Sequence, residues 1–425
     1  MKRSTERILT THAGSLPRPA DLLAMIQAKE RGGVYDRDAY AARVRNAVAE
    51  IVAKQARLGL DVVDDGEMGK PGFIPYVNER LAGFEPDSAR RGSPFAGSRE
   101  FKSFPEFYEW FGRTLPSPAA SLPHMVCTGP ISYQGYALVK ADIDNLKAAL
   151  KDVSAEEAFL PAISPTSIED WQTNRYYRTN EEYLYAIADA MHEEYRAIVD
   201  AGLLVQIDDP HIATYYALHP ELGLREIRKW AEERVAALNH ALRGIPRERI
   251  RWHTCYGINI GPRVHDMELK DFIDIIVKVR AGAYSFEAAN PRHEHEWPLW
   301  KDARLAEGTV LIPGVITQSN VMVEHPALIA ERIVRFADVV GRENVIAGAD
   351  CGFGTFAGSQ EIHESVVWAK FSAMAEGARI ASERLWKKRA SRGDPVRRPR
   401  SRRAAGYSSR RAPSAPRKSR SGRKR

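Results

Sequence analysis

The chain has 425 residues, and 44% of them are apolar, which is enough to form the core of one large domain or of two smaller ones. No run of about 18 consecutive apolar residues occurs, so the sequence predicts no membrane-spanning helix. Residues Met1 to Thr10 are polar and charged and lack the apolar core of a secretory signal. We therefore expect a soluble, cytoplasmic protein.

The net charge of +7 combines two regions of opposite sign. Residues 387–425 contain 17 Lys and Arg and one acid, Asp394, giving +16; the remaining residues contain 45 bases and 54 acids, giving −9. From about Ala390 the chain is rich in Arg, Ser, Pro and Gly, a composition that buries too little apolar surface to offset the entropy lost on ordering. We predict one globular domain over 1–389 and a disordered tail over 390–425, solvated rather than bound to nucleic acid.

The alternation of short apolar runs with amphipathic helices is typical of βαβ units. Nine segments are predicted as strands: Ile8–Ala13, Asp61–Asp65, His124–Thr128, Ala158–Ile163, Leu203–Ile207, Ile250–Cys255, Ala283–Glu287, Val310–Val315 and Val345–Ala349. Helices are predicted over Asp36–Leu58, Asn180–Ala201, Glu221–Leu242, Glu268–Val279, Ala327–Val340 and Glu361–Lys387. Asn180 is the predicted N-cap of the second of these helices.

Nine strands are one more than a (β/α)8 barrel needs. The stretch from about Gly83 to Leu122 is rich in Pro, Gly and aromatic residues and has no periodicity, so we interpret it as an excursion. His124–Thr128 is the candidate for the strand that lies outside the barrel. The predicted fold is therefore α/β, a (β/α)8 TIM barrel with an excursion after its second strand and a disordered basic tail.

The three cysteines, Cys127, Cys255 and Cys351, are too few to indicate a disulfide scaffold, so in a reducing compartment they are free to bind metal or react. We interpret Cys127 as a small buried apolar residue. Cys351 follows the last predicted strand, and Cys255 ends an earlier one two residues after His253. Residues two apart in a strand point to the same side, so His253 and Cys255 can reach one ion.

Three motifs, His253-Thr254-Cys255, Phe286-Glu287 and Asp350-Cys351-Gly352, resemble in order and in strand-end placement those of the catalytic C-terminal barrel of cobalamin-independent methionine synthase. The resemblance runs from about Arg7 to Trp386. It implies that His253, Cys255, Glu287 and Cys351 bind Zn²⁺, and that the group that reacts with the alkyl donor is the zinc-bound thiolate of the substrate. A free thiol has a pKa of about 8.5, and coordination to zinc deprotonates it.

The resemblance also implies contacts with the thiol substrate. The turn Gly14-Ser15-Leu16-Pro17 is similar to the family's Gly-Ser-Phe-Pro turn, which contacts the carboxylate of the amino acid. Glu67 and Asp208 match the two acidic residues that hold the amino group of homocysteine in the family. Carboxylates pair well with an ammonium group, which leaves the thiol free to point at the metal.

The sequence departs from the methionine synthase pattern in two places. It has no counterpart of the second barrel that helps to hold folate, and Ser319 stands where the family has a His that assists proton transfer, so no general acid is identified. The alternative is a resemblance to epoxyalkane:coenzyme M transferases, single barrels in which the thiolate opens an epoxide. Candidates for contact with an anionic thiol, or with the residues around it, are His12, Arg18 and His211.

His293 and His295 lie in a segment a few residues after Glu287, where they would cover the substrate or support the site rather than bind a second metal. A third possible function belongs to another class, a zinc-stabilised barrel without turnover whose basic tail binds nucleic acid. The full set of polar strand-end residues argues against it. The expected partners are a small thiol and an alkyl donor, with no membrane; the sequence does not specify the oligomeric state.

Overall fold

The computed structural model describes residues 1–87, 96–114, 124–257, 260–359 and 362–387. Among them, Met1–Trp386 form one compact unit. The tail predicted over 390–425 lies outside the described residues, so its disorder and the domain boundary at residue 389 stay predictions.

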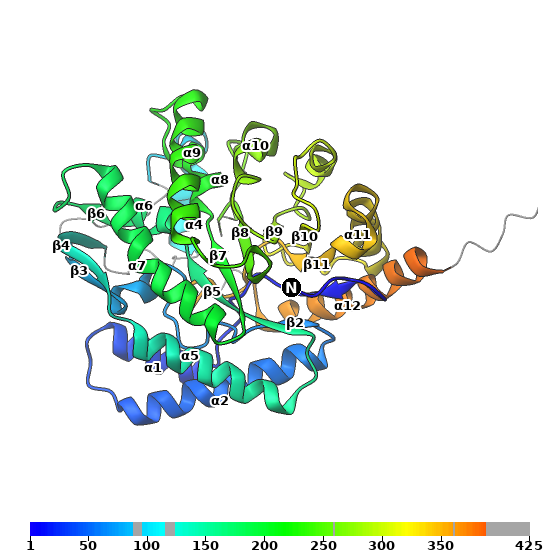
Figure 1. Cartoon of the computed structure of the whole chain (residues 1–425), viewed down its shortest axis with the longest axis horizontal. Helices are drawn as coiled ribbons and strands as arrows, with labels where there is room; N and C mark the ends of the chain where they lie inside the picture. The colour runs from blue at the N-terminus through cyan, green and yellow to red at the C-terminus, as the bar shows by residue number, and fades with distance from the viewer. Residues whose placement is uncertain (88–95, 115–123, 258–259, 360–361, 388–425) are drawn as a thin grey trace, which may run out of the picture. The chain divides into compact units, whose positions relative to one another are not determined.

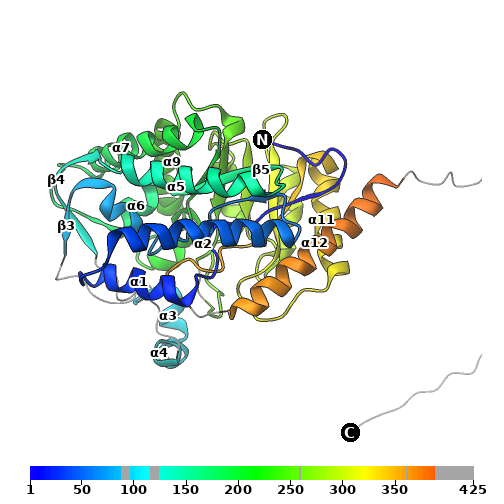
Figure 2. The same cartoon turned by 90° about the horizontal axis from the view of Figure 1, so that it is seen from below.

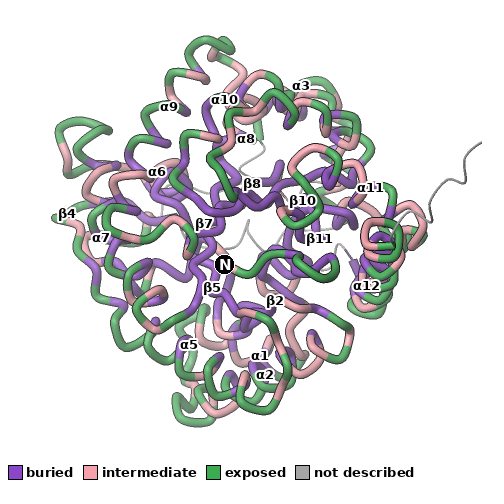
Figure 3. Tube along the Cα trace, turned by 45° about the vertical axis from the view of Figure 1, so that its right-hand side comes forward, coloured by how far each residue is buried: buried purple, intermediate pink, exposed green. Residues whose placement is uncertain are grey.

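An eight-stranded parallel sheet curls into a nearly closed barrel at the centre of this unit (Figures 1 and 3), in the order β1-β11-β10-β9-β8-β7-β5-β2. The backbone N–H of Asp61 donates to the Thr10 carbonyl at 3.0 Å, which links the first strand to the segment that leads into the second. The strands are β1 (Leu9–Thr10), β2 (Val62–Val63), β5 (Glu157–Ile163), β7 (Leu204–Asp208), β8 (Ile250–Thr254), β9 (Ala283–Phe286), β10 (Val310–Ile316) and β11 (Ile346–Ala349).

Helices surround the barrel, and those that contact its strands pack on them through buried apolar side chains. Figure 2 shows α1 and α2 side by side, with α3 and α4 projecting beyond them. No helix in the described part of the chain is long and apolar enough to cross a membrane. The α-helices are α1 (Ala20–Glu30), α2 (Arg37–Arg57), α3 (Arg99–Ser103), α4 (Pro105–Thr114), α5 (Tyr136–Ala149), α6 (Pro165–Trp171), α7 (Asn180–Asp200), α8 (His211–Leu218), α9 (Leu224–Ala241), α10 (Ile273–Ile276), α11 (Pro326–Val340) and α12 (Glu364–Trp386).

Strands on either side of the predicted excursion form a small separate sheet. β3 (Leu81–Pro86) pairs antiparallel with β4 (Met125–Tyr133), and β4 pairs parallel with β6 (Thr173–Asn174). The predicted strand His124–Thr128 therefore lies outside the barrel, and the other eight predicted strands correspond to the eight strands of the barrel. Cys127 is buried in β4, away from the barrel sheet, as expected for a packing residue.

Four helix predictions need correction. The helix predicted over Glu361–Lys387 begins at Glu364 as α12, and Glu361 itself lies outside the described residues. Thr179, not Asn180, is the N-cap of α7, because its side chain accepts from the N–H of Glu182 at 3.1 Å. α9 begins at Leu224 rather than Glu221, with the Glu226 carboxylate accepting from the N–H of Gly223. The helix predicted over Glu268–Val279 is broken into a 3-10 turn, Leu269–Asp271, and the short α10.

The break has a tertiary cause. Phe272 is buried with an extended φ of −146°, and the Glu296 carboxylate accepts from the N–H of Leu269 at 2.7 Å. These tertiary contacts therefore outweigh the helical periodicity of the segment.

Candidate metal centre

The carboxyl ends of β8 and β11 bring together one imidazole and two thiols. His253 lies in β8, Cys255 follows it, and Cys351 follows β11; their possible ligand atoms all lie within 4.8 Å of one another. The two sulfur atoms are 3.1 Å apart, and all three side chains are buried. These three of the four metal ligands predicted from the sequence therefore lie close together in the structure.

The electrostatics of the group suit a divalent cation. Burial and the nearby Arg251 guanidinium lower the pKa of His253 to about 3, so its imidazole is neutral, the form that binds metals. Its Nδ1 lies 3.1 Å from the Ser285 hydroxyl, which fixes the ring orientation. The hydrogen bond with Cys255, together with burial, raises the pKa of the Cys351 thiol. A cation relieves the cost of two adjacent thiolates, and this donor set fits zinc.

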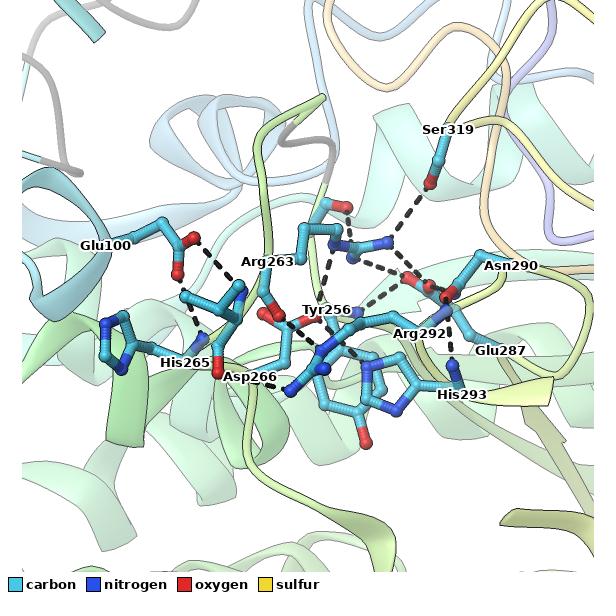
Figure 4. Close-up of polar contacts among 12 residues, drawn as sticks. Glu100, Tyr256, Arg263, His265, Asp266, Glu287, Asn290, Arg292, His293 and Ser319 are labelled. Carbon is cyan, nitrogen blue, oxygen red and sulfur yellow. Dashed lines mark hydrogen bonds and ion pairs between the residues drawn. The ribbon is translucent and has the colours of Figure 1, made fainter. Parts of the chain in front are cut away.

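Glu287, which follows β9, is not brought into this group of three among the described residues. Its Oε1 accepts from the N–H of Tyr256 at 2.8 Å, and both oxygens accept from the Arg263 guanidinium at 3.0 and 3.2 Å (Figure 4). Asn290 Nδ2 also donates to Oε2. Its role as a fourth ligand stays a prediction.

Each residue of the Asp350-Cys351-Gly352 motif has a separate role in the geometry. Asp350 Oδ1 accepts from the N–H groups of Ala288 and Ala289, both at 2.8 Å, and so ties the chain after β9 to the end of β11. A Cβ on Gly352 would lie 2.0 Å from the Ser15 hydroxyl. Glycine is therefore required for the predicted substrate-contacting turn to approach the metal ligands.

A second candidate site contains two carboxylates. Glu67 lies in the segment after β2, and Asp208 ends β7. Both are buried, and Glu67 Oε2 has no hydrogen-bond partner among the residues that the structure describes. Burial and the Glu67 carboxylate raise the pKa of Asp208 well above its usual range. Lys70 Nζ lies 3.6 Å from Glu67 Oε1, and Gln206 donates to Asp208 at 2.9 Å. A further cation would relieve the repulsion between the two carboxylates.

Two of the candidates for contact with an anionic thiol, His12 and Arg18, already make hydrogen bonds to other groups of the protein. His12 is buried between Phe159 and Phe371, with Nε2 2.8 Å from Gln55 and Nδ1 accepting from Gly14. Arg18 donates to the carbonyls of Gly354 and Glu67, at 2.6 and 2.9 Å. These contacts show both residues shaping the chain around Ser15 and Glu67.

The remaining histidines differ in their surroundings. His211 Nε2 lies 3.4 Å from Asp170, whereas its buried Nδ1 has no partner. His293 stacks on Tyr256 with ring centroids 3.7 Å apart, and its nitrogens contact Glu296 and Asp266 at 2.8 and 3.1 Å. Hydrogen bonds to Asp266 and Glu296 outweigh the opposing effect of burial and raise the pKa of His293 to about 9. His295 is exposed, whereas His293 is buried, and their role as cover or support for the site stays a prediction.

Arg263 is the residue of the site that sequence reasoning missed. It is buried, and its guanidinium joins Glu287 to Ser319. Nothing in the spacing of the motifs indicates it, because it reaches the site from an irregular loop with a positive φ of 58°.

The fold and the metal-ligand group of His253, Cys255 and Cys351 define a class, a parallel barrel with a buried His-Cys-Cys group suited to a metal ion at the carboxyl ends of its strands. The family model described as "Cobalamin-independent synthase, Catalytic domain" matches residues 8–91 and 127–374. The chain belongs to this family and is a methionine synthase-family transferase.

Similar proteins include two archaeal methionine synthases. The one from Thermococcus kodakarensis is 24% identical over 378 residues, covering 88% of this chain and 94% of the relative. The one from Sulfolobus acidocaldarius is 26% identical over 382 residues, covering 89% and 94%. A solved B12-independent methionine synthase from Shewanella sp. W3-18-1, in complex with selenomethionine, shares the fold with a TM-score of 0.68 and 19% identity, covering 89% of this chain and 99% of that one.

Proposed function

We propose that this (β/α)8-barrel protein is a zinc-dependent S-methyltransferase that acts on homocysteine or a closely related thiol. The observation that carries the proposal is the buried group of His253, Cys255 and Cys351, whose donors suit zinc. When bound, zinc would deprotonate the substrate thiol and so raise its nucleophilicity. We propose Glu287 as an exchangeable fourth ligand, and a reducing, cytoplasmic location accords with the three free cysteines.

The rest of the site would hold the amino acid. Glu67, with its unpartnered Oε2, and Asp208 beside it would accept from the ammonium group of the substrate. Ser15, positioned against Gly352, would contact the substrate carboxylate. These contacts would orient the sulfur toward His253, Cys255 and Cys351, and fixed orientation is a large part of the rate enhancement in group transfer.

One observation favours an epoxide as an alternative electrophile. Ser319 supplies no imidazole to protonate a departing pterin, and its hydroxyl accepts from Arg263. Opening an epoxide releases no separate leaving group, so addition of the thiolate to an epoxide is the alternative for the same site.

The test uses the full chain loaded with zinc and supplied with homocysteine. Four donors are compared by mass spectrometry of the product: an N-methyl pterin, a methyl corrinoid, an S-methyl sulfonium and an epoxide. We expect S-methylation with at least one methyl donor, and a rate at least about 100-fold lower in Cys351→Ser, which should also lose zinc. Cys127→Ser is the matched control, because it removes a buried thiol elsewhere. Turnover with the epoxide alone, or no turnover by folded, zinc-loaded protein, would reject methyl transfer.

A further inference from the structure

Arg263 is a buried residue of the candidate metal centre that donates hydrogen bonds to other protein groups through both of its Nη atoms. Nη1 contacts Glu287 Oε2 at 3.0 Å and Ser319 Oγ at 3.1 Å, and Nη2 contacts Glu287 Oε1 at 3.2 Å. Nε lies 3.2 Å from Asp266 Oδ2. The guanidinium grips Glu287 with two N–H groups, the geometry in which arginine binds a carboxylate most firmly (Figure 4).

Glu287 therefore has two possible partners. As an exchangeable fourth ligand it would contact the metal, whereas the structure shows its carboxylate held by Arg263. The Glu287 side chain is fully buried, and a buried carboxylate without a partner is strongly unfavourable. A ligand of this kind leaves readily only where another cationic group is already in place to receive it.

We propose that Arg263 is a positioning residue that receives the Glu287 carboxylate when the substrate thiol takes the place of that carboxylate at the metal. This inference rests on the proposed function. In the structure Arg263, Tyr256 and Asn290 all donate to the Glu287 carboxylate, and these are the contacts that would receive it.

Two residues hold the loop around Arg263 in place, so that its guanidinium has a fixed position from which to receive the Glu287 carboxylate. Buried Glu100, in α3 of the excursion, accepts from the N–H groups of Val264 and His265 at 3.1 and 3.0 Å. Arg292 donates to the carbonyls of Arg263 and Val264 at 2.8 and 3.1 Å. These contacts hold Arg263 at its positive φ, a conformation that a side-chain-bearing residue adopts at a cost. The excursion thereby contacts the loop that carries Arg263.

The experiment measures coordination rather than turnover. The full chain is loaded with Co²⁺ in place of zinc and titrated with homocysteine, and the increase in Co²⁺–sulfur absorption gives the dissociation constant of the thiol. The variants are Arg263→Met, Glu287→Gln and the double variant. We expect about one Co²⁺ per chain in each, because His253, Cys255 and Cys351 remain.

Arg263→Met should weaken thiol binding about tenfold or more, since Glu287 then has no cationic group to move to. In the Glu287→Gln background the same change should alter thiol binding by less than about twofold, since the two residues act as one unit. An equal loss in both backgrounds, or no loss in either, would overturn the inference.

Two further variants keep the result interpretable. Arg234→Met removes another buried arginine held by both oxygens of a carboxylate, Glu169, and should leave the Co²⁺ spectrum and thiol affinity unchanged. If Arg263→Met does not fold, Arg263→Lys keeps the charge but loses the paired N–H groups; we expect weakened thiol binding, and wild-type affinity would overturn the inference. Wild-type protein that binds neither Co²⁺ nor thiol would overturn the proposed function as well, whereas normal binding with no effect of Arg263→Met would overturn this inference alone.

Discussion

At the scale of single residues, Glu67 combines a strained backbone with an unpartnered carboxylate oxygen. Its φ of +57° is in the left-handed region, which side-chain-bearing residues rarely occupy. Asp65 accepts from its N–H at 2.9 Å, and Arg18 donates to its carbonyl at 2.9 Å, so the surroundings maintain the strain. Glu67 Oε2 is buried and accepts no hydrogen bond from the described part of the chain. Strain maintained around a free acceptor is what a pre-formed binding group requires.

Glu67→Gln should raise the KM for homocysteine about 10- to 100-fold, because a charge-assisted hydrogen bond to the ammonium group is lost. 4-Mercaptobutyrate, the same thiol without its amino group, should bind the wild type weakly and should be almost unaffected by the substitution. Steady-state kinetics with both thiols provide the measurement, and Asp208→Asn should behave alike. Equal losses for the two thiols would contradict a role in holding the amino group.

The residues of the metal centre differ in how far the sequence predicts them. His253 and Cys255 share a strand, so their two-residue spacing alone places them on one side, and Asp350-Cys351-Gly352 ends another strand of the same sheet. Arg263 could not be predicted, because its position depends on a positive φ and on Glu100, which lies far away in the sequence. The contacts of Glu287 were missed for the same reason.

At the scale of elements, strands are predicted better than helix ends. The nine strand candidates correspond to eight barrel strands and β4, because buried parallel strands are short, apolar and flanked by polar ends. The short strands β3 and β6 and the helices α1, α3, α4, α5, α6 and α8 were not predicted, and α10 is much shorter than expected. A helix end depends on which side chain reaches a particular N–H group, and neighbouring residues compete for that position.

The N-terminus of α7 provides a measurable case of this competition. Thr179→Ala should lower the free energy of unfolding by about 1 kcal/mol, because the N–H of Glu182 loses its acceptor. Asn180→Ala, a change at the adjacent exposed residue, should alter it by less than about 0.5 kcal/mol. Urea unfolding of both variants measures the difference; the reverse order would show that Asn180 is the cap after all.

At the scale of the whole molecule, the metal-ligand group joins strands that are already connected. β8 and β11 are linked through β9 and β10 by hydrogen-bonded ladders, and the barrel rests on a large apolar core. A metal ion therefore adds one connection among many, unlike the ion of a small domain that depends on it to fold.

Chelation should abolish methyl transfer to the thiol while leaving the far-ultraviolet circular dichroism spectrum unchanged. It should lower Tm by only a few degrees. Differential scanning calorimetry of the metal-loaded and metal-free full chain tests this expectation, with Cys351→Ser as a second metal-free sample. Unfolding of the metal-free chain at 25 °C would show that the ion holds the barrel together.

The two parts of the site come from different halves of the chain. The candidate substrate contacts, Ser15, Glu67 and Asp208, precede residue 210, whereas the metal group begins at His253 and ends at Cys351. Natural selection can therefore act on them separately. On the proposed function, substitutions in the first half would change which thiol is accepted, whereas the second half would preserve the means of activating it. A lineage can then acquire new substrates through a succession of active intermediates, without passing through a form that has lost its metal.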